Sequence, residues 1–531
     1  MTNKVLLKFA KKGINLSPDA YEKIINSDNP INLASSLIVK LKSNNFNMND
    51  LISVDGKVID ELLYDKKKPS EENENEKKTI DSFKKKSDED KKPKTLPTNS
   101  EKVVDEKIEF KRNLKKSNVE YDFKIIQDTS KKSYTTGEIG DLIQYFKSRY
   151  EKLHKILSAR PELKMTTKVS DIDESQTTIN LILMVKDIKS TKNGHKIVDF
   201  EDDTGSISIL FSNKNEELFQ QAEKLVKDEV VGVITTQYEN QNSNFNKFGY
   251  SANELIFPGV TRIKEKEMDF SIVFLSDVHI GSLTFLENEF KNFIDWINCE
   301  YGNEEQRKVA ENVKYLVIGG DLVDGVGVYP NQDKELSISD VRLQYREAAR
   351  FLGNIRSDIK IIIAPGNHDP CRLAEPQPAV PEEFAKELYE LDNVEFVSNP
   401  AVVSLDGIEV LIYHGESFNE LVMAVKDFTL EKNELIMEEL LNKRHVAPIY
   451  GERTPLASEL EDYLVIENIP DIFHTGHVHI NTHKKYKGIH LINSGTFQTQ
   501  TEYQKIYNIE PTPAEVPVIY KGKYLIYKFT D

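Results

Sequence analysis

Five short polar clusters between residues 277 and 479 constrain this chain more than any other feature, because each follows an apolar, strand-like run. Their carboxylate, imidazole and amide groups are those that bind divalent metal ions in proteins. Polar groups that follow successive buried strands are expected to meet in loops at one edge of a sheet. The clusters are Ser276-Asp277-Val278-His279, Gly319-Gly320-Asp321-Leu322-Val323-Asp324, Pro365-Gly366-Asn367-His368-Asp369, Tyr413-His414-Gly415 and Gly476-His477-Val478-His479.

The spacing within these clusters indicates which side chains act together. Asp277 and His279 are one residue apart, so on an extended segment their side chains face the same way and can bind one ion. His477 and His479 have the same spacing. Asp321 follows a Gly-Gly pair at a strand end, and its two carboxylate oxygens can bridge two ions. Because two ions about 3.5–4 Å apart polarise a phosphoryl oxygen and activate water, the clusters predict a two-metal centre that hydrolyses a phosphate ester.

The remaining cluster residues have narrower expected roles. Asn367 offers a neutral amide oxygen to the second ion, and His414 lies at the end of its own strand. His368 is adjacent to Asn367 but points elsewhere, so it is the natural proton donor to the leaving oxygen. Asp324 and Asp369 suit hydrogen bonding behind the ligands, or helix capping, better than ligation.

Composition and charge limit the classes of protein to which the chain can belong. At 531 residues it is too long for a single core, and two to four domains are expected. A net charge of −17 argues against a protein that coats nucleic acid, but it leaves room for a DNA enzyme with a local basic surface. No apolar run approaches the roughly 18 residues that span a bilayer, and the N-terminus lacks the apolar core of a signal peptide. We therefore expect a soluble cytoplasmic protein with no membrane partner.

The first two segments of the chain differ sharply in composition. Residues 1–64 are expected to form a small helical docking domain, with helical candidates at 31–41 and 48–63. Across 65–116 aliphatic residues are scarce, and lysine and glutamate runs alternate. Such a segment cannot bury enough apolar surface to offset its ordering entropy, so we expect a disordered charged linker. Its lysine runs either touch DNA or are simply solvated.

Residues 117–265 are expected to hold a helix followed by an OB-fold β-barrel. The order of strand and helix patterns, with an acidic Thr-Gly turn at 201–205, is typical of such barrels. Few aromatic or basic residues line the strands, so a structural or subunit-docking role fits them as well as binding of a nucleic-acid strand. The expected helices cover 135–162 and 216–226, and the expected strands cover 178–185, 195–200, 206–211 and 230–235.

Residues 266–531 are expected to form an α/β domain, because short buried runs alternate with helical patterns. Each polar cluster lies just past a strand end, where open sheets place their sites. The fold class predicted for the whole chain is therefore multidomain α/β. The expected strands cover 272–275, 315–318, 359–363, 410–413 and 472–473, and the expected helices cover 286–297, 339–352, 381–391 and 418–428.

The order of the five clusters resembles that of the calcineurin-like metallophosphoesterases, over residues 268 to about 505. Every position of that family's pattern is filled here. The resemblance implies a proton donor, His368, and two bound divalent ions. Manganese fits a mixed shell of imidazole, carboxylate and amide groups, and magnesium or another divalent ion is the alternative. The implied ligands are Asp277, His279, Asp321 and His479 for one ion, and Asp321, Asn367, His414 and His477 for the other.

The wider layout resembles the small-subunit family of the archaeal family-D DNA polymerases. The sequence segments 275–282, 319–325 and 364–369 look like those of that family. The order of a helical module, a charged tether, a barrel and a phosphoesterase domain also resembles it. The resemblance implies a 3′→5′ exonuclease that edits single-stranded DNA ends beside a large polymerising subunit. A sliding clamp or a primase is a further candidate partner.

Two other interpretations of the sequence remain open. In the first, the chain is a largely structural polymerase subunit whose phosphoesterase fold is a docking platform, which the acidic charge and the non-catalytic N-terminal segments favour. In the second, it is a free-standing repair nuclease or phosphatase. Binding of manganese, cleavage of single-stranded DNA and co-purification with a large polymerase chain discriminate among the three.

Overall fold

The computed structural model separates the chain into two units, Met1–Val104 and Asp105–Asp531. Within the described residues, no helix is both long enough and apolar enough to cross a bilayer. The expected linker at 65–116 lies outside the described residues. The structure describes residues 119–132, 135–173, 175–239, 248–506 and 508–530, and in the first unit residues 14–16, 23–25, 30, 33–34, 37 and 52–54.

The first unit contains a short parallel pair of strands. Strand β1 (Ile14–Leu16) pairs in register with β2 (Ile52–Val54). The prediction of a helix over 48–63 is therefore wrong for Ile52–Val54. This strand is set by its pairing with residues far away in sequence, and such a pairing leaves no periodic pattern in the local sequence. Ala34 and Leu37 are helical and buried, in agreement with the helix expected at 31–41.

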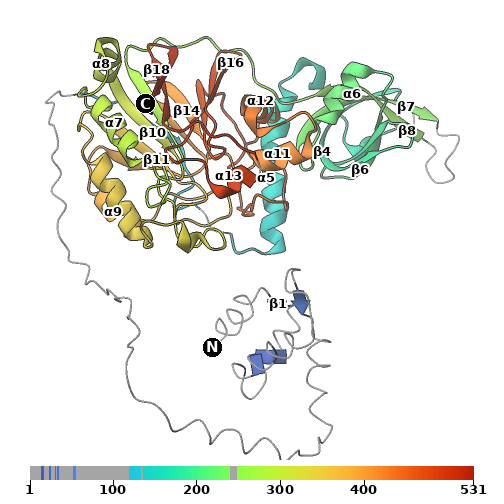
Figure 1. Ribbon diagram of the computed structural model, residues 1–531. Coiled ribbons are helices and arrows are strands. Elements are labelled where there is room, and N and C mark those ends of the chain that lie inside the picture. The colour runs from blue at the N-terminus through green and yellow to red at the C-terminus, as the bar shows by residue number, and fades with distance from the viewer. Residues whose placement is uncertain are drawn as a thin grey trace, which may run out of the picture. The chain divides into compact units, whose positions relative to one another are not determined.

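In the second unit, five strands close into a barrel in the order β4-β5-β6-β8-β7, with an apolar interior (Figure 1). Four of the strands and helix α6 (Glu216–Glu223) follow the sequence prediction. Strand β8 was not predicted, because Gly249, Asn253 and Glu254 interrupt its alternation of apolar and polar residues. The strands are β4 (Thr178–Ser190), β5 (Lys196–Glu201), β6 (Ser206–Phe211), β7 (Val230–Glu239) and β8 (Phe248–Ile256).

The remaining strands form two six-stranded sheets. The first sheet has the order β12-β11-β10-β9-β18-β19, and its first four strands run parallel. Strand β18 is antiparallel to β9, and β19 is antiparallel to β18. These strands are β9 (Ser271–Leu275), β10 (Val313–Gly319), β11 (Lys360–Ala364), β12 (Val394–Phe396), β18 (Glu515–Tyr520) and β19 (Lys523–Lys528).

The second sheet has the order β16-β17-β15-β14-β13-β3, with β14, β15 and β17 parallel. The expected division at residue 265 assigned β3 to the barrel segment, but its antiparallel hydrogen bonds to β13 place it in this sheet. The pairing of β3 with β13 could not be predicted from the order of the elements, because the barrel segment separates the two strands in the chain. The strands are β3 (Phe123–Gln127), β13 (Ala401–Leu405), β14 (Ile408–Ile412), β15 (Ile472–Thr475), β16 (Thr482–Tyr486) and β17 (Ile489–Asn493).

The two sheets pack face to face and helices cover their outer faces, which gives four layers (Figure 1). Alternation along each strand sends one set of apolar side chains between the sheets and the other set toward the helices, as Val317 and Leu316 of β10 do. The first sheet is covered by α7 (Glu287–Ile297), α8 (Glu304–Glu311), α9 (Val341–Leu352) and α10 (Glu382–Tyr389). The second is covered by α11 (Phe418–Ala424) and α12 (Asn433–Lys443).

Buried charges join the barrel to the layered part. Helix α5 (Ile139–Ser158) carries Arg149, which is fully buried and donates from Nε to Asp462 Oδ2 at 2.7 Å. Its other nitrogens donate to the Asp228 carbonyl oxygen of the β-barrel and to the Tyr145 hydroxyl. The barrel and the sheets therefore share a buried polar junction, and a second buried pair joins Lys443 of α12 to Glu229 before β7 at 2.8 Å.

Candidate metal centre

The five polar clusters occupy the loops that directly follow five parallel strands. Asp277 follows β9, and Asp321 and Asn367 follow β10 and β11. In the second sheet, His414 follows β14 and His477 follows β15. Because parallel strands end at the same edge of a sheet, and the two sheets are stacked, all five loops converge. The structure thus brings together all seven predicted ligands and His368.

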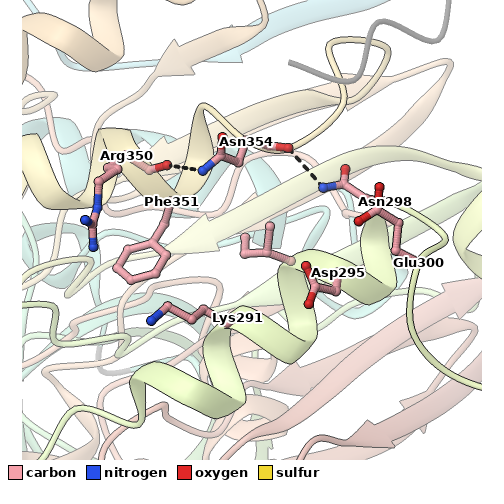
Figure 2. A pocket seen from close by; sticks show the side chains of 8 residues that line it. Lys291, Asp295, Asn298, Glu300, Arg350, Phe351 and Asn354 are labelled. Carbon is pink, nitrogen blue, oxygen red and sulfur yellow. Dashed lines mark hydrogen bonds between the residues drawn. The ribbon is translucent and has the colours of Figure 1, made fainter. Parts of the chain in front are cut away.

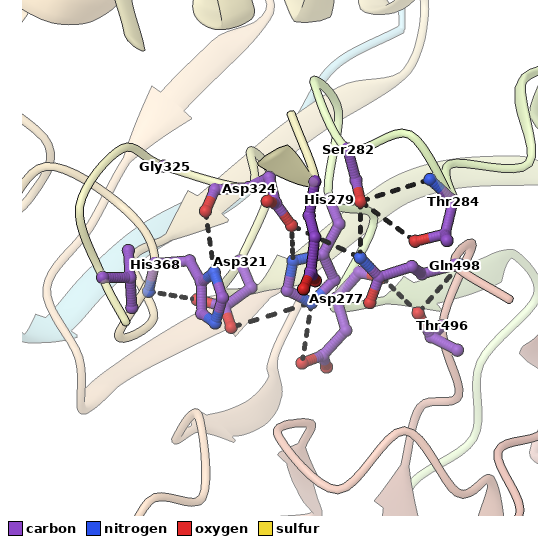
Figure 3. Close-up of polar contacts among 12 residues, drawn as sticks. Asp277, His279, Ser282, Thr284, Asp321, Asp324, Gly325, His368, Thr496 and Gln498 are labelled. Atoms are coloured by element: carbon purple, nitrogen blue, oxygen red, sulfur yellow. Dashed lines mark hydrogen bonds and ion pairs between the residues drawn. The ribbon is translucent and has the colours of Figure 1, made fainter. Parts of the chain in front are cut away.

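The first predicted ligand set is Asp277, His279, His479 and Asp321, and the donor atoms of the first three lie within 4.8 Å of one another. Figure 3 shows Asp277, His279 and Asp321. His279 Nε2 lies 3.1 Å from His479 Nε2, and His479 Nε2 lies 3.3 Å from Asp277 Oδ1. His279 Nε2 is also 3.9 Å from Asp277 Oδ1 and 4.0 Å from Asp321 Oδ2. Ligands about 2.0–2.2 Å from a four-coordinate ion are themselves about 3–4 Å apart, so this spacing fits a divalent cation.

The second group contains Asp321, Asn367, His414 and His477. His414 Nε2 lies 3.3 Å from Asp321 Oδ2 and 3.0 Å from Asn367 Oδ1. His477 Nδ1 lies 3.0 Å from the same Asn367 oxygen. Asp321 Oδ2 therefore faces both groups, which is the position that a bridging carboxylate needs.

One carboxylate oxygen in the first group accepts no well-formed hydrogen bond, although His479 Nε2 lies 3.3 Å from it. Asp277 Oδ1 is buried and has no hydrogen-bond partner, whereas Asp277 Oδ2 accepts a hydrogen bond from the His477 backbone N–H. Burial of an unpartnered carboxylate oxygen is costly unless a positive charge compensates it. The donor set and this orphaned oxygen both fit a metal ion held at this point.

Charge interactions dominate the ionisation of these groups. Burial opposes ionisation of Asp277, but the charges of His479 and His414 outweigh it and lower the pKa of Asp277 to about 2. Burial likewise disfavours the charged form of His414, yet Asp321 raises the pKa of His414 to about 10. Metal ions bind the deprotonated ligands, so binding here is accompanied by proton release.

The backbone at the centre is unusual, because five of the seven predicted ligands have positive φ. The values are 53° for Asp277, 55° for His279, 51° for Asp321, 71° for His477 and 60° for His479. Non-glycine residues rarely adopt this left-handed region, and such strain collects at functional sites. The expectation that each Asp-x-His or His-x-His segment is extended is therefore wrong, because tight left-handed turns aim these side chains into the centre.

Two glycines in the clusters allow the loops to approach closely. A methyl group on Gly366 would lie 2.3 Å from Asp321 Oδ1, and one on Gly476 would lie 2.4 Å from Asp277 Oδ2. Both distances are far inside van der Waals contact, so a side chain at either position would displace a predicted ligand. This is the physical reason for glycine before Asn367 and before His477.

Hydrogen bonds behind the centre orient the histidine rings (Figure 3). His279 Nδ1 donates to Asp324 Oδ1 at 3.1 Å, and His414 Nδ1 donates to the Gly319 carbonyl at 2.9 Å. In both rings Nε2 is therefore the atom presented to the centre. Asp369 accepts from the backbone N–H groups of Asp321 and Gly366. The supporting roles predicted for Asp324 and Asp369 agree with these contacts.

Several supporting residues were not found from the sequence. Gln498 Nε2 donates to Asp324 Oδ1 at 3.3 Å (Figure 3), and Gln504 Nε2 lies 2.8 Å from His479 Nδ1. Asn419 Nδ2 lies 2.9 Å from His477 Nε2. Each is a single amide in a segment without a motif, so no local signal marks it.

The centre opens to solvent on one side. Asn367, His368 and His477 are partly exposed, whereas Asp277 and Asp321 are buried. His368 Nδ1 donates to the Asp324 carbonyl at 2.7 Å, so its Nε2 is the atom available to a bound molecule. Burial lowers the pKa of His368.

A separate cavity of about 450 Å³ lies between α7 and α9 and contains none of the predicted site residues (Figure 2). Its cations already form ion pairs, Lys291 with Glu287 and Arg350 with Glu347. Two asparagines brace it, since Asn298 donates to the Asn354 carbonyl. The lining carries both positive and negative charges, so it favours neither an anionic nor a cationic ligand.

Comparison with known proteins covers the segment that carries the candidate centre. Residues 272–484 match the family model that describes the B subunits of DNA polymerases alpha and epsilon, and this match contains all eight predicted site residues. The chain is 50% identical over 528 residues to the DNA polymerase II small subunit of Methanothermobacter thermautotrophicus, covering 99% of this chain and 100% of that one. The chain belongs to the archaeal DNA polymerase II small-subunit family. The resemblance to the small-subunit family of the archaeal family-D DNA polymerases is confirmed.

Other members of the family are also similar. The chain is 43% identical over 406 residues to the small subunit of Archaeoglobus fulgidus, covering 76% of this chain and 80% of that one. It is 42% identical over 400 residues to that of Methanocaldococcus jannaschii, covering 75% of this chain and 66% of that one.

Proposed function

We propose that this chain is the 3′→5′ exonuclease subunit of a replicative DNA polymerase and removes nucleotides from single-stranded DNA ends. Its partner is a large polymerising subunit, in keeping with the name of its relatives. In this proposal the barrel is an OB-type module and the layered part is a metallophosphoesterase domain. The observation that carries the proposal is the shared Asp321 oxygen, 3.3 Å from His414 Nε2 and 4.0 Å from His279 Nε2.

Two divalent ions, manganese being the best match to the ligands, would be held by the two donor groups that meet at Asp321. When bound, they supply charge that polarises the scissile phosphate and activates water. The chain's own contribution is rigidity, because the left-handed backbone at Asp277 and His279 and the hydrogen bond from His279 to Asp324 fix the donor atoms before the substrate arrives.

His368 is the proposed proton donor to the leaving 3′ oxygen. The Asp324 carbonyl holds its Nδ1–H, and its ring packs edge-on against His279 with centroids 4.7 Å apart. These two contacts fix the orientation of the His368 ring and therefore the position of its Nε2 atom. Burial favours the neutral ring, and the negative charge of an approaching phosphodiester favours the protonated ring that can donate.

Replacing His368 with alanine is expected to lower exonuclease turnover about 10²–10⁴-fold, the usual contribution of a positioned acid. The assay is release of nucleotides from a 5′-labelled single-stranded oligonucleotide with Mn²⁺. Manganese binding should be retained, because no predicted ligand changes. His195→Ala, at a partly exposed histidine before β5 of the barrel, is the matched control.

Two results would reject the proposal. Unchanged cleavage by the His368→Ala variant would remove His368 from the mechanism. A wild-type chain that binds no manganese and cuts no single-stranded DNA, yet co-purifies with a large polymerase chain, would leave a structural subunit as the function instead.

A further inference from the structure

An exposed aromatic residue lies at the open side of the metal centre. Tyr329 is 37% exposed, and its ring centroid is 6.1 Å from that of His368 in an edge-on arrangement. It lies in the loop between β10 and α9, whose neighbouring residue Val326 is 50% exposed. An exposed aromatic ring beside the candidate centre is suited to a ligand with an apolar face.

The Tyr329 loop is tied to the groups that orient the centre. The buried Gln332 side chain accepts a hydrogen bond from the Val328 backbone N–H at 2.9 Å. Gln332 Nε2 donates to the Asp324 carbonyl at 2.8 Å and to Asp324 Oδ2 at 3.1 Å. Asp324 also orients His279 and His368 (Figure 3). The backbone next to Tyr329 is therefore connected to the proposed proton donor by a chain of hydrogen bonds through Gln332 and Asp324.

The hydroxyl of Tyr329 is already engaged, because it donates to Glu335 Oε2 at 3.0 Å. A bound molecule would thus contact the ring rather than the hydroxyl. Leu283, whose side chain is 63% exposed, is held next to this loop because its backbone N–H donates to the Glu335 carbonyl at 2.8 Å. An aromatic ring next to His368 suits a nucleobase better than a second phosphate.

We propose that Tyr329 is the stacking platform for the nucleobase next to the scissile phosphate, so that the chain holds the last nucleotide of a single strand by its base. This inference rests on the proposed exonuclease function. Stacking on an aromatic ring tolerates every base, because each base has a π-face. A terminal base that is paired in a duplex is held by its Watson–Crick edge and by stacking on the neighbouring pair, so the platform favours an unpaired end.

The kinetic test uses the purified full chain with Mn²⁺ and oligonucleotides that end in a normal or an abasic nucleotide. Tyr329→Ala should raise KM for the normal end roughly 5- to 150-fold with a smaller change in kcat, from the usual value of one stacked base. Tyr329→Phe keeps the ring and loses only the hydrogen bond to Glu335, so it should restore most of the affinity that Tyr329→Ala loses. On the abasic end all three proteins should behave alike. Tyr301→Ala, at a tyrosine that is 43% exposed before α8, is the control.

A direct test does not need cleavage. An oligonucleotide with 2-aminopurine at its 3′ end is titrated with the His368→Ala chain, with and without Tyr329→Ala. Fluorescence quenching that requires Tyr329 supports stacking even if the wild-type chain proves to have no nuclease activity, in which case only the proposed function fails. Equal quenching with and without Tyr329, or equal KM changes on normal and abasic ends, would overturn the inference. So would a Tyr329→Ala variant that cuts normally and fails only to assemble with a large polymerase subunit.

Discussion

Replacing Asp321 with alanine is expected to abolish both exonuclease activity and the binding of two metal ions. Its Oδ2 atom faces His414 and His279, so the two donor groups lose their only common member. Its Oδ1 atom accepts a hydrogen bond from the His368 backbone N–H at 2.8 Å, so the position of the proposed proton donor is lost too. The loss should exceed the roughly 10–100-fold that removal of an outer hydrogen-bond partner of a metal site costs.

The measurement is manganese stoichiometry by calorimetry, together with nucleotide release from a labelled single strand. Asp333→Ala is the matched control, because this exposed aspartate lies in the same loop without facing the centre. Asp324→Asn is a useful intermediate, since it should weaken metal binding without removing a ligand. An Asp321→Ala chain that still binds two ions would show that the two groups are independent sites.

Replacing Arg149 with methionine is expected to destabilise the second unit by about 3–5 kcal/mol, the usual cost of removing one partner of a buried ion pair. Asp462 would keep a buried carboxylate without its cation. Burial opposes ionisation of Asp462, but His445 and Arg149 outweigh it and hold the pKa of Asp462 well below its usual range. The Tyr145 hydroxyl and the Asp228 carbonyl would also lose a donor.

Urea unfolding of the full chain, followed separately by far-ultraviolet circular dichroism and by tryptophan fluorescence, measures this loss. Lys147→Met on the same helix is the control, because the Lys147–Glu151 pair is exposed and contributes at most about 1 kcal/mol. The double variant Arg149→Met/Asp462→Leu should recover part of the stability, since it leaves no buried charge unpaired. A single Arg149→Met variant as stable as the wild type would mean that this junction does not hold the barrel to the sheets.

The centre could be predicted from the sequence because its signal is local. Each cluster is a few residues long and follows a buried strand, and parallel strands bring such loops together whatever the details of packing. The spacing of Asp277 and His279 correctly predicts that their side chains lie together, although the extended segment expected between them is wrong. Their segment is a left-handed turn rather than an extended strand, and backbone strain of this kind leaves no mark in residue type.

The features that were missed depend on partners distant in the chain. Strand β3 joins β13 across the whole of the barrel segment, and β8 closes the barrel despite a weak alternation. Gln498 and Gln504 support the centre from a segment with no recognisable pattern. Pairings of this type are decided by the assembled fold, so they are found only when the structure is known.

The number of metal ions that the chain holds tests the shared role of Asp321 most directly. Titration of the metal-free full chain with Mn²⁺, followed by calorimetry and electron paramagnetic resonance, measures both the stoichiometry and the magnetic coupling between ions. A two-metal centre predicts two ions per chain with coupled spins. The His414→Ala variant removes a ligand of one group only, so it should bind a single, uncoupled ion. Two ions without coupling, or no ion bound at all, would contradict it.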